Sequence, residues 1–387
     1  MSAGKKTSVI TAGLALFSMF FGAGNLIWPI ILGEQSGDKS LFALLGLVIT
    51  GVSLPFLGLI AMMLFDGDNK SFFARIGKLP CLFLLFIIQA LIGPFGAVPR
   101  IIALSYGTLK SYLPEGTSLL SFSILFSVIV LFFTLRKNRI IELLGTLLTP
   151  ILLLSLGALF AFGLPYAPEA KSLALSTNDA FTSGLKVGYN TLDLIASFLF
   201  APMVLAHFTG GDRSQDKKAA CKKMLQASSL AAFLLGIIYL GLIYLSAHYA
   251  PVLGKGLLPE EKLREIALLI LGPKGALVAS VAVVLACLTT AIPLIAISSD
   301  YIRQDLLKNR GGSFAPLFIA LAISALIANL GFMGIAHFLS PILQILCPGL
   351  IVLSVLNILH KLYEIQVAKV PVYAAFALST IGYAAMI

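Results

Sequence analysis

Long apolar runs alternate with short polar breaks along the whole chain. Each run is long enough to cross a hydrocarbon layer of roughly 30 Å as a helix, so the pattern predicts about eleven transmembrane helices and no separate soluble domain. The expected spans are residues 8–33, 41–65, 80–108, 118–135, 140–163, 181–207, 227–249, 274–302, 314–331, 334–359 and 370–387. Residues 258–270 are amphipathic, with a proline and acids at their start, and predict a helix at the membrane surface.

Composition supports the same class. Of 387 residues, 59% are hydrophobic and 11% are charged, and the mean hydropathy is +1.00. No soluble domain has such a composition, so the chain is predicted to be an all-α polytopic membrane protein. A net charge of +10 would suggest nucleic acid as a partner of a soluble chain. Here Lys and Arg concentrate in the loops, and neither a nucleic-acid partner nor an obligate protein partner is expected.

The basic residues also predict the orientation in the membrane. With a cytoplasmic N-terminus, the inside segments carry 18 Lys and Arg and the outside segments carry 8. This asymmetry fits the positive-inside rule, and an odd number of spans then places the C-terminus outside. The tract with Lys217, Lys218, Lys222 and Lys223 is expected to lie near anionic headgroups, so membrane lipid is an expected partner.

The first predicted span contains a pattern that a continuous helix avoids. It reads Phe20-Phe21-Gly22-Ala23-Gly24-Asn25-Leu26-Ile27-Trp28-Pro29. Each glycine weakens a helix by about 1 kcal/mol, and a proline removes a backbone donor. Backbone without helical hydrogen bonds is tolerated at membrane depth where it lines a cavity. The pattern therefore predicts a discontinuous helix that exposes backbone groups to a substrate or ion, and the alternative is a glycine-rich face for helix packing.

A transporter built from inverted repeats should have a second discontinuous helix in its sixth span. That span contains Ser197 in its middle and Pro202 further on, which allow a break but do not require one. We therefore interpret the chain as one transmembrane domain, 1–387, with repeats at about 8–163 and 181–359 and a further helix at 370–387. The two halves share no repeat at the level of single residues.

Two adjacent threonines, Thr289 and Thr290, lie in the otherwise apolar eighth span. Ala286 precedes Thr289 by three residues and could lend a carbonyl from the same helical face. Hydroxyls and free carbonyls are the ligands that a hard cation such as Na⁺ prefers. The alternative is that these hydroxyls bond back to their own helix or to a neighbouring helix.

Asp193 and Arg100 are the clearest charges inside the predicted spans. A charge at this depth is costly and is a hypothesis of function by default. Asp193 could coordinate a cation or titrate, and Arg100 could pair with a carboxylate or brace a gate. The alternative for both is a structural ion pair or a position near the interface.

Several of these stretches together resemble the bacterial branched-chain amino acid:cation symporter family, in the family's order over most of the chain. The matching stretches are residues 20–29, Gly93-Pro94 through Pro99-Arg100, Gly188-Tyr189 with Thr191 and Asp193, and Ala286-Cys287-Leu288-Thr289-Thr290-Ala291-Ile292. The resemblance implies a LeuT-like core of two inverted five-helix repeats, with discontinuous helices 1 and 6. It also implies import of leucine, isoleucine and valine with a cation, usually Na⁺, across the bacterial inner membrane. The family is usually drawn with twelve spans, one more than predicted here.

The resemblance further implies two sets of site residues. The substrate would be held by two segments, whose residues are Gly22, Ala23, Gly24 and Asn25, and Ser197, Phe198, Phe200 and Ala201. The first segment would cradle the carboxylate, and main-chain groups of the second would take the ammonium. The cation would be held by the carbonyls of Ser18, Phe21 and Ala286 and the hydroxyls of Thr289 and Thr290. Asp193 and Arg100 remain candidates for coupling or gating.

We therefore predict a secondary transporter that works by alternating access, with Na⁺ as the coupling ion and no other cofactor. The first alternative is a proton-coupled transporter of other small neutral amino acids that uses Asp193. A passive channel is a further alternative. A membrane-embedded enzyme is not expected, because the spans contain no His-Glu-x-x-His, no Ser/His pair and no paired aspartates.

Overall fold

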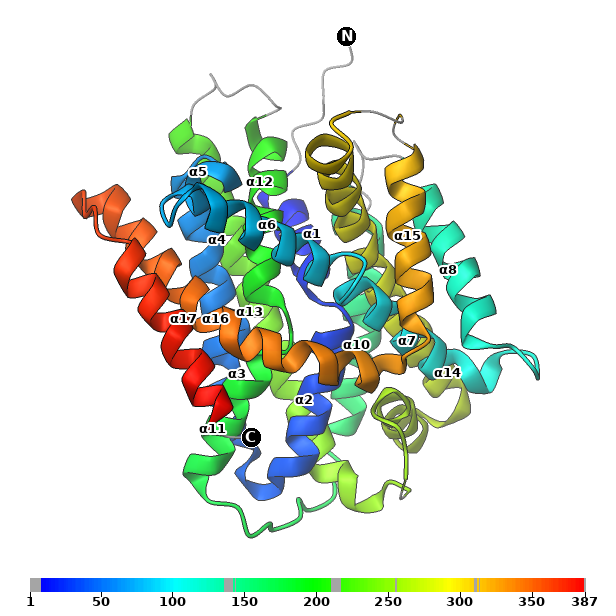
Figure 1. The fold of residues 1–387 in the computed structure, drawn as a ribbon. Coiled ribbons are helices and arrows are strands. Elements are labelled where there is room, and N and C mark those ends of the chain that lie inside the picture. The colour runs from blue at the N-terminus through cyan, green and yellow to red at the C-terminus, as the bar shows by residue number, and fades with distance from the viewer. Residues whose placement is uncertain are drawn as a thin grey trace.

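The computed structural model describes residues 8–135, 142, 144–209, 217–254, 256–309, 312 and 314–385, and in these residues it contains helices and no strands. Figure 1 shows the helices gathered into one bundle, with α1 and α2 running through its middle. The predicted all-α class is confirmed. Some of the basic residues used to predict the orientation lie outside the described residues, in segments 1–7, 136–141 and 210–216. Some positions of the fifth and the last predicted span also lie outside them.

The α-helices have the following bounds: α1 Val9–Phe20, α2 Ala23–Ser36, α3 Ser40–Val48, α4 Leu54–Leu64, α5 Asn69–Ala74, α6 Lys78–Ile92, α7 Ala97–Leu109, α8 Leu119–Thr134, α10 Thr149–Gly163, α11 Thr177–Tyr189, α12 Asp193–Thr209, α13 Lys217–Tyr249, α14 Pro259–Tyr301, α15 Phe314–Ala328, α16 Gly331–Tyr363 and α17 Lys369–Ala384. Short π-helical turns follow α3 (Ile49–Ser53), precede α10 (Leu144–Leu148) and follow α14 (Ile302–Leu306).

Fewer helices are long enough to span a membrane than the sequence predicts. Within the described residues, six helical stretches are long and apolar enough to cross a membrane, and the bent pair α11–α12 makes a seventh. Helices α1, α8 and α15 are apolar but shorter. The predicted count of eleven is therefore not confirmed, and the division into two repeats stays a prediction.

The first break lies between α1 and α2. Helix α1 ends at Phe21, whose ψ of 75° leaves the helical region, and Gly22 is extended with φ −108° and ψ −158°. Pro29 is accommodated inside α2, so it does not mark the break. The first-turn N–H groups of α2 receive no side-chain cap. The predicted discontinuous first helix is present, and its break is at the glycine-rich stretch.

The second break separates α11 from α12, whose axes bend by 42°. Leu192 has a φ of 70°, in the left-handed region that a residue with a side chain rarely adopts. Three residues, 190–192, make this turn, and α12 begins at Asp193. The sequence pointed to Ser197 and Pro202 as the break, but both lie within α12. The break was correctly placed in the sixth span and wrongly placed along it.

A third break, which the sequence analysis did not predict, divides the span expected at 80–108. Helix α6 ends before Gly93-Pro94-Phe95-Gly96, and α7 starts at Ala97. Pro94 has no amide hydrogen, and a Cβ built on Gly93 would lie 2.2 Å from Ser298 Oγ. The glycine therefore lets the backbone approach α14 closely at the break.

The amphipathic segment at 258–270 forms a helix, as predicted. It is the first part of α14, and Gly272, with φ 69° and ψ −172°, separates it from the long apolar part. At its start the Glu261 carboxylate accepts a hydrogen bond of 3.1 Å from the Leu258 N–H. This contact satisfies one of the donors that every helix start leaves free.

Candidate functional site

The two predicted breaks meet in the middle of the bundle. A Cβ built on Gly24, in the first turn of α2, would lie 3.2 Å from both Cα and the carbonyl oxygen of Thr191. It would also lie 3.4 Å from the carbonyl oxygen of Asn190. Glycine is therefore required at position 24 because backbone from the other break passes against it. The two readings of the glycine pattern, a break and a packing contact, both hold here.

A buried polar cluster joins the breaks to α13. Asn25 Nδ2 donates to Asp193 Oδ2 over 2.5 Å and to the Tyr239 hydroxyl over 2.7 Å. The Tyr239 hydroxyl donates to the same carboxylate oxygen over 3.2 Å. All three side chains are at most 3% exposed. These bonds hold a carboxylate at the start of α12, where the helix dipole favours a negative charge.

Arg100, on α7, lies at the same place. Its Nη1 donates to the carbonyl oxygen of Asn190 over 3.0 Å, which satisfies a group freed by the second break. The guanidinium lies 5.7 Å from the centre of the Phe332 ring, within cation–π range. Arg100 is 2% exposed, and its Nε has no hydrogen-bond partner in the described structure. The ion pairs between described residues include neither Arg100 nor Asp193.

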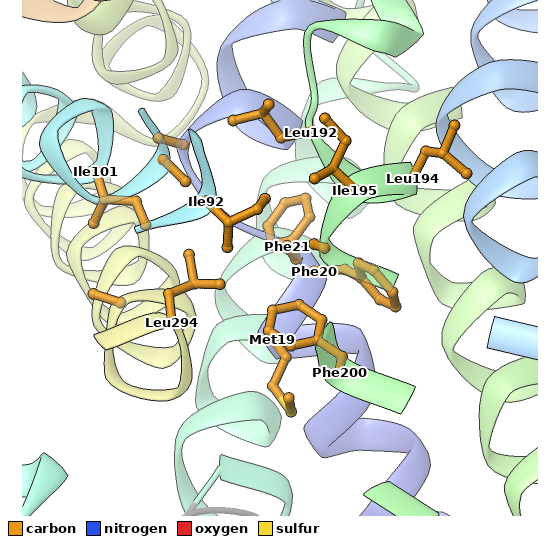
Figure 2. Close-up of a cluster of buried hydrophobic side chains, with 14 of the residues drawn as sticks. Met19, Phe20, Phe21, Ile92, Ile101, Leu192, Leu194, Ile195, Phe200 and Leu294 are labelled. Carbon is orange, nitrogen blue, oxygen red and sulfur yellow. The ribbon is translucent and has the colours of Figure 1, made fainter. Parts of the chain in front are cut away.

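These groups surround a small cavity of about 20 Å³. A volume of this size holds about one water molecule and is far below the range of about 300–1,000 Å³ of small-molecule sites, so the structure is nearly closed at this point. Figure 2 shows the cluster of buried apolar side chains at this place, whose labelled members come from α1, α6, α7, α12 and α14 and from the two predicted breaks. The cavity is lined by Met19, Phe20, Gly22, Ala23, Gly24, Asn25, Ile92, Ala97, Arg100, Ile101, Thr191, Leu192, Asp193, Ala196, Phe200, Thr290 and Leu294. It therefore combines an apolar wall with one cation and one anion.

The cavity includes only part of the predicted substrate residues. All four members of the first segment line it, and so does Phe200, whose ring packs edge-on against Phe20 at 5.2 Å. Ser197, Phe198 and Ala201 are not among the lining residues. Ser197 Oγ bonds back to the Leu194 carbonyl over 2.7 Å. Phe198 packs against Phe72 and Phe73 on α5. The early start of α12 explains this, because it turns these residues away from the break.

The residues predicted for the cation come together beside the cavity. Thr290 Oγ1 lies 2.9 Å from the Ser18 carbonyl oxygen, and Thr289 Oγ1 lies 3.2 Å from the same oxygen. Thr289 Oγ1 also donates to the Ala286 carbonyl over 2.8 Å. All four residues are buried. Two hydroxyls and two carbonyls from α1 and α14 thus converge without a net charge.

Phe21, the fifth predicted ligand, is the residue at which α1 ends. It precedes Gly22, and a Cβ built on Gly22 would lie 2.9 Å from Cγ2 and 3.1 Å from Oγ1 of Thr290. The main chain of the first break therefore passes directly against Thr290. Thr289 bonds both within its helix and across to α1, and Thr290 bonds across to α1. These contacts also fit the alternative, in which the hydroxyls bond to their own helix or to a neighbouring helix, so a cation site here stays a prediction.

The two ends of the bundle differ. At the end where α1 begins, a hollow of about 480 Å³ is lined by Asn69, Gln89, Leu199, Pro202, Met203, Ala296, Ile297, Asp300, Tyr301, Gln304 and Asp305. At the other end, the first part of α14 covers α2 and α7. Lys262 pairs with Glu34, and Thr108 Oγ1 donates to the Glu260 carbonyl over 3.2 Å. The cavity therefore lies between a hollowed end and a covered end.

Sequence comparison assigns the family. A profile described as branched-chain amino acid transport protein matches residues 5–386. The chain belongs to this family. It is a family of multi-pass membrane transporters. The prediction that the chain is a transporter and not an enzyme is therefore confirmed.

Individual relatives agree with the family. The chain is 31% identical over 369 residues to the branched-chain amino acid permeases BrnQ of Lactobacillus delbrueckii subsp. lactis and Bacillus subtilis, covering 92% of this chain and 82% of each relative. It is 33% identical over 400 residues to a putative branched-chain amino acid carrier protein of Staphylococcus aureus, covering 97% of this chain and 87% of that protein.

Solved structures share the fold. Mhp1, a nucleobase-cation-symport-1 family transporter, matches with a TM-score of 0.63 and 15% identity, over 100% of this chain and 94% of Mhp1. A Na⁺-coupled sialic acid symporter matches with a TM-score of 0.64 and 12% identity, over 99% and 91%. MhsT, in complex with L-phenylalanine, matches with a TM-score of 0.59 and 16% identity, over 97% and 100%. The predicted LeuT-like fold is confirmed.

Sequence reasoning missed Tyr239 and the wall formed by Ile92, Ile101 and Leu294. The only signal for Tyr239 is a polar tip in an apolar helix, which many tyrosines at membrane interfaces share. The wall residues carry no signal, since any apolar residue in a span looks the same in the sequence.

Removing the Tyr239 hydroxyl tests the polar cluster. Tyr239→Phe deletes an acceptor for Asn25 and a donor to Asp193, so we expect a loss of about 1–2 kcal/mol in stability. Thermal unfolding of the purified protein in detergent measures this. Tyr166→Phe is the control, because Tyr166 is 81% exposed. Equal melting temperatures for the two variants would show that the cluster does not stabilise the fold.

Proposed function

We propose that this protein imports leucine, isoleucine and valine by Na⁺ symport, through alternating access. The family and its relatives support the substrate, and the LeuT-like fold supports a symporter. One observation carries the choice of ion: the hydroxyls of Thr289 and Thr290 both reach the Ser18 carbonyl, next to the first break. Oxygen ligands without a net charge suit a hard monovalent cation.

The positions of the two sites explain how coupling would work. Thr290 belongs both to the ion group and to the cavity lining. An ion between α1 and α14 would hold the first break against Thr290 and so complete the substrate cavity. Each ligand then binds better when the other is present, which is the differential affinity that coupling requires.

The orientation belongs to the same proposal. We place the N-terminus in the cytoplasm of a bacterium and the chain in its inner membrane, as the distribution of basic residues predicts. The hollow at the α1 end then opens to the cytoplasm, and the end with Lys262 and Glu34 faces outward. In this arrangement the structure corresponds to a state that is closed to the outside.

Proton coupling through Asp193 is the second candidate. The observation that favours it is the burial of this carboxylate among neutral donors, Asn25 and Tyr239, at the cavity wall. A carboxylate at that depth is a common carrier of protons in transporters. Protonation would weaken its hydrogen bonds to both donors and so alter the contact between the breaks.

Uptake into proteoliposomes tests the function. We expect radiolabelled leucine to accumulate above the external concentration when an inward Na⁺ gradient is present, and not when the same gradient is dissipated. Accumulation driven only by a pH gradient would replace Na⁺ with H⁺ and make Asp193 the coupling residue. Uptake that never exceeds the external concentration would identify a passive channel and contradict symport.

A further inference from the structure

We infer that Arg100 and Asp193 form a two-point clamp for the charged groups of the substrate: Arg100 binds the carboxylate, and Asp193 binds the ammonium. This inference rests on the proposed transport of amino acids and names the residues that would select them. It assigns the ammonium to a side chain of α12, rather than to the main chain near Ser197–Ala201.

The guanidinium of Arg100 has one free edge. Nη1 is engaged with Asn190, whereas Nε is buried without a partner and no hydrogen bond between described residues uses Nη2. Nε and Nη2 point the same way from the planar group and together match the two oxygens of a carboxylate. An unpaired buried donor is costly, so a ligand that satisfies this edge would be favoured. The uncapped N–H groups at the start of α2 line the same cavity and would add further donors.

The carboxylate of Asp193 lines the cavity. Oδ2 receives the hydrogen bonds from Asn25 and Tyr239, and the Thr191 side chain also interacts with the carboxylate. The side chain is held in place by its two donors, so the carboxylate is preorganised for a cation. An ammonium group supplies three donors and a positive charge to such a carboxylate.

The two charges are held at the same break. Arg100 is tethered to Asn190, three residues before Asp193, and both charged side chains line the cavity. They do not pair with each other within the described structure, so each is left to a ligand. Apart from Asn25, Thr191 and Thr290, the rest of the wall is formed by apolar residues and glycines. The charged groups and the apolar wall are therefore complementary to a zwitterion with an apolar side chain, which the cavity would admit when it widens. They would reject molecules that lack either charge.

Charge-deleted ligands test the clamp directly. We would measure binding of leucine, leucinol and 4-methylpentanoate to the purified protein in nanodiscs with Na⁺ present. Leucinol keeps the ammonium without the carboxylate, and 4-methylpentanoate keeps the carboxylate without the ammonium. We expect the wild type to bind leucine at least about 100-fold more tightly than either analogue, because a buried charge without its partner is strongly penalised.

The variants should lose selectivity in opposite directions. Arg100→Gln should weaken leucine about 100-fold and leave leucinol within about threefold. Asp193→Asn should weaken leucine similarly and leave 4-methylpentanoate within about threefold. A variant that weakens leucine and both analogues by one common factor would show a structural role and overturn the clamp. So would a variant with unchanged affinity for leucine.

Two further variants distinguish a loss of substrate contacts from a loss of folding. Arg100→Lys keeps the charge without the two-donor edge, so it should fold and still weaken leucine at least about tenfold; wild-type affinity would overturn the bidentate contact. Arg75→Gln is the matched control, because Arg75 binds Asn357 Oδ1 and main-chain carbonyls outside the cavity. It should leave all the affinity ratios unchanged.

The outcomes separate the clamp from the proposed function. If the wild type binds leucine but the affinity ratios of the variants do not change, the clamp fails and leucine transport stands. If another zwitterionic amino acid replaces leucine with the same dependence on both charges, the clamp stands and the substrate assignment fails. A wild type that binds no zwitterionic amino acid overturns both.

Discussion

In Thr289→Ala/Thr290→Ala, the Na⁺ concentration for half-maximal leucine uptake is expected to rise at least about tenfold. The double substitution removes two of the oxygens that converge on the Ser18 carbonyl. A loss of about 1.4 kcal/mol in ion binding already corresponds to a factor of ten, and two ligands contribute more than that. Leucine affinity should fall only when Na⁺ is limiting, because the ion and the substrate are coupled.

The measurement is a titration of external Na⁺ during initial-rate uptake in proteoliposomes. Ser280→Ala/Thr134→Ala is the matched control, since both hydroxyls are buried and bond only to carbonyls of their own helices. The control should show the wild-type Na⁺ dependence. If the threonine variant also keeps it, these oxygens do not bind the ion. The next variant is then Asp193→Asn, with pH dependence as the readout.

Gly24→Leu is expected to abolish detectable leucine binding. A side chain at this position meets the main chain of Thr191 and Asn190, which cannot move aside as a side-chain tip can. The two breaks would be forced apart, which displaces Asn25 from Asp193 and opens the cavity wall. Binding of radiolabelled leucine to the purified protein measures the effect, and elution as a single species in size-exclusion chromatography shows that the protein is folded.

Gly157→Leu is the control for this substitution. Gly157 lies in the middle of α10, and a Cβ built there has no heavy atom within 4 Å. We expect wild-type binding from the control, and from Gly24→Ala a defect smaller than that of Gly24→Leu. Wild-type affinity in Gly24→Leu would contradict the close approach of the two breaks at the site.

The sequence determined the features that depend on local chemistry. Apolar runs predict buried or lipid-facing helices wherever they fold, and glycines in the first span weaken the helix at the place where it breaks. Thr289 and Thr290 were identified because two hydroxyls in an apolar helix need partners. The family resemblance supplied the fold and the expectation of an ion site between the first and eighth spans. The contacts of Thr289 and Thr290 with Ser18 show that these two spans meet there, and the ion site stays a prediction.

Only the tertiary structure decided where the second break lies and what surrounds it. Leu192 adopts a left-handed conformation that its residue type does not favour, and this requires contacts from elsewhere in the chain. The carboxylate of Asp193 depends on Asn25, 168 residues earlier, and on Tyr239, 46 residues later. Arg100 is tied to a carbonyl that is free only because α11 ends there. The local sequence shows that a charged residue will be buried at a cost in free energy. The partners that offset this cost come from distant segments, so only the tertiary structure identifies them.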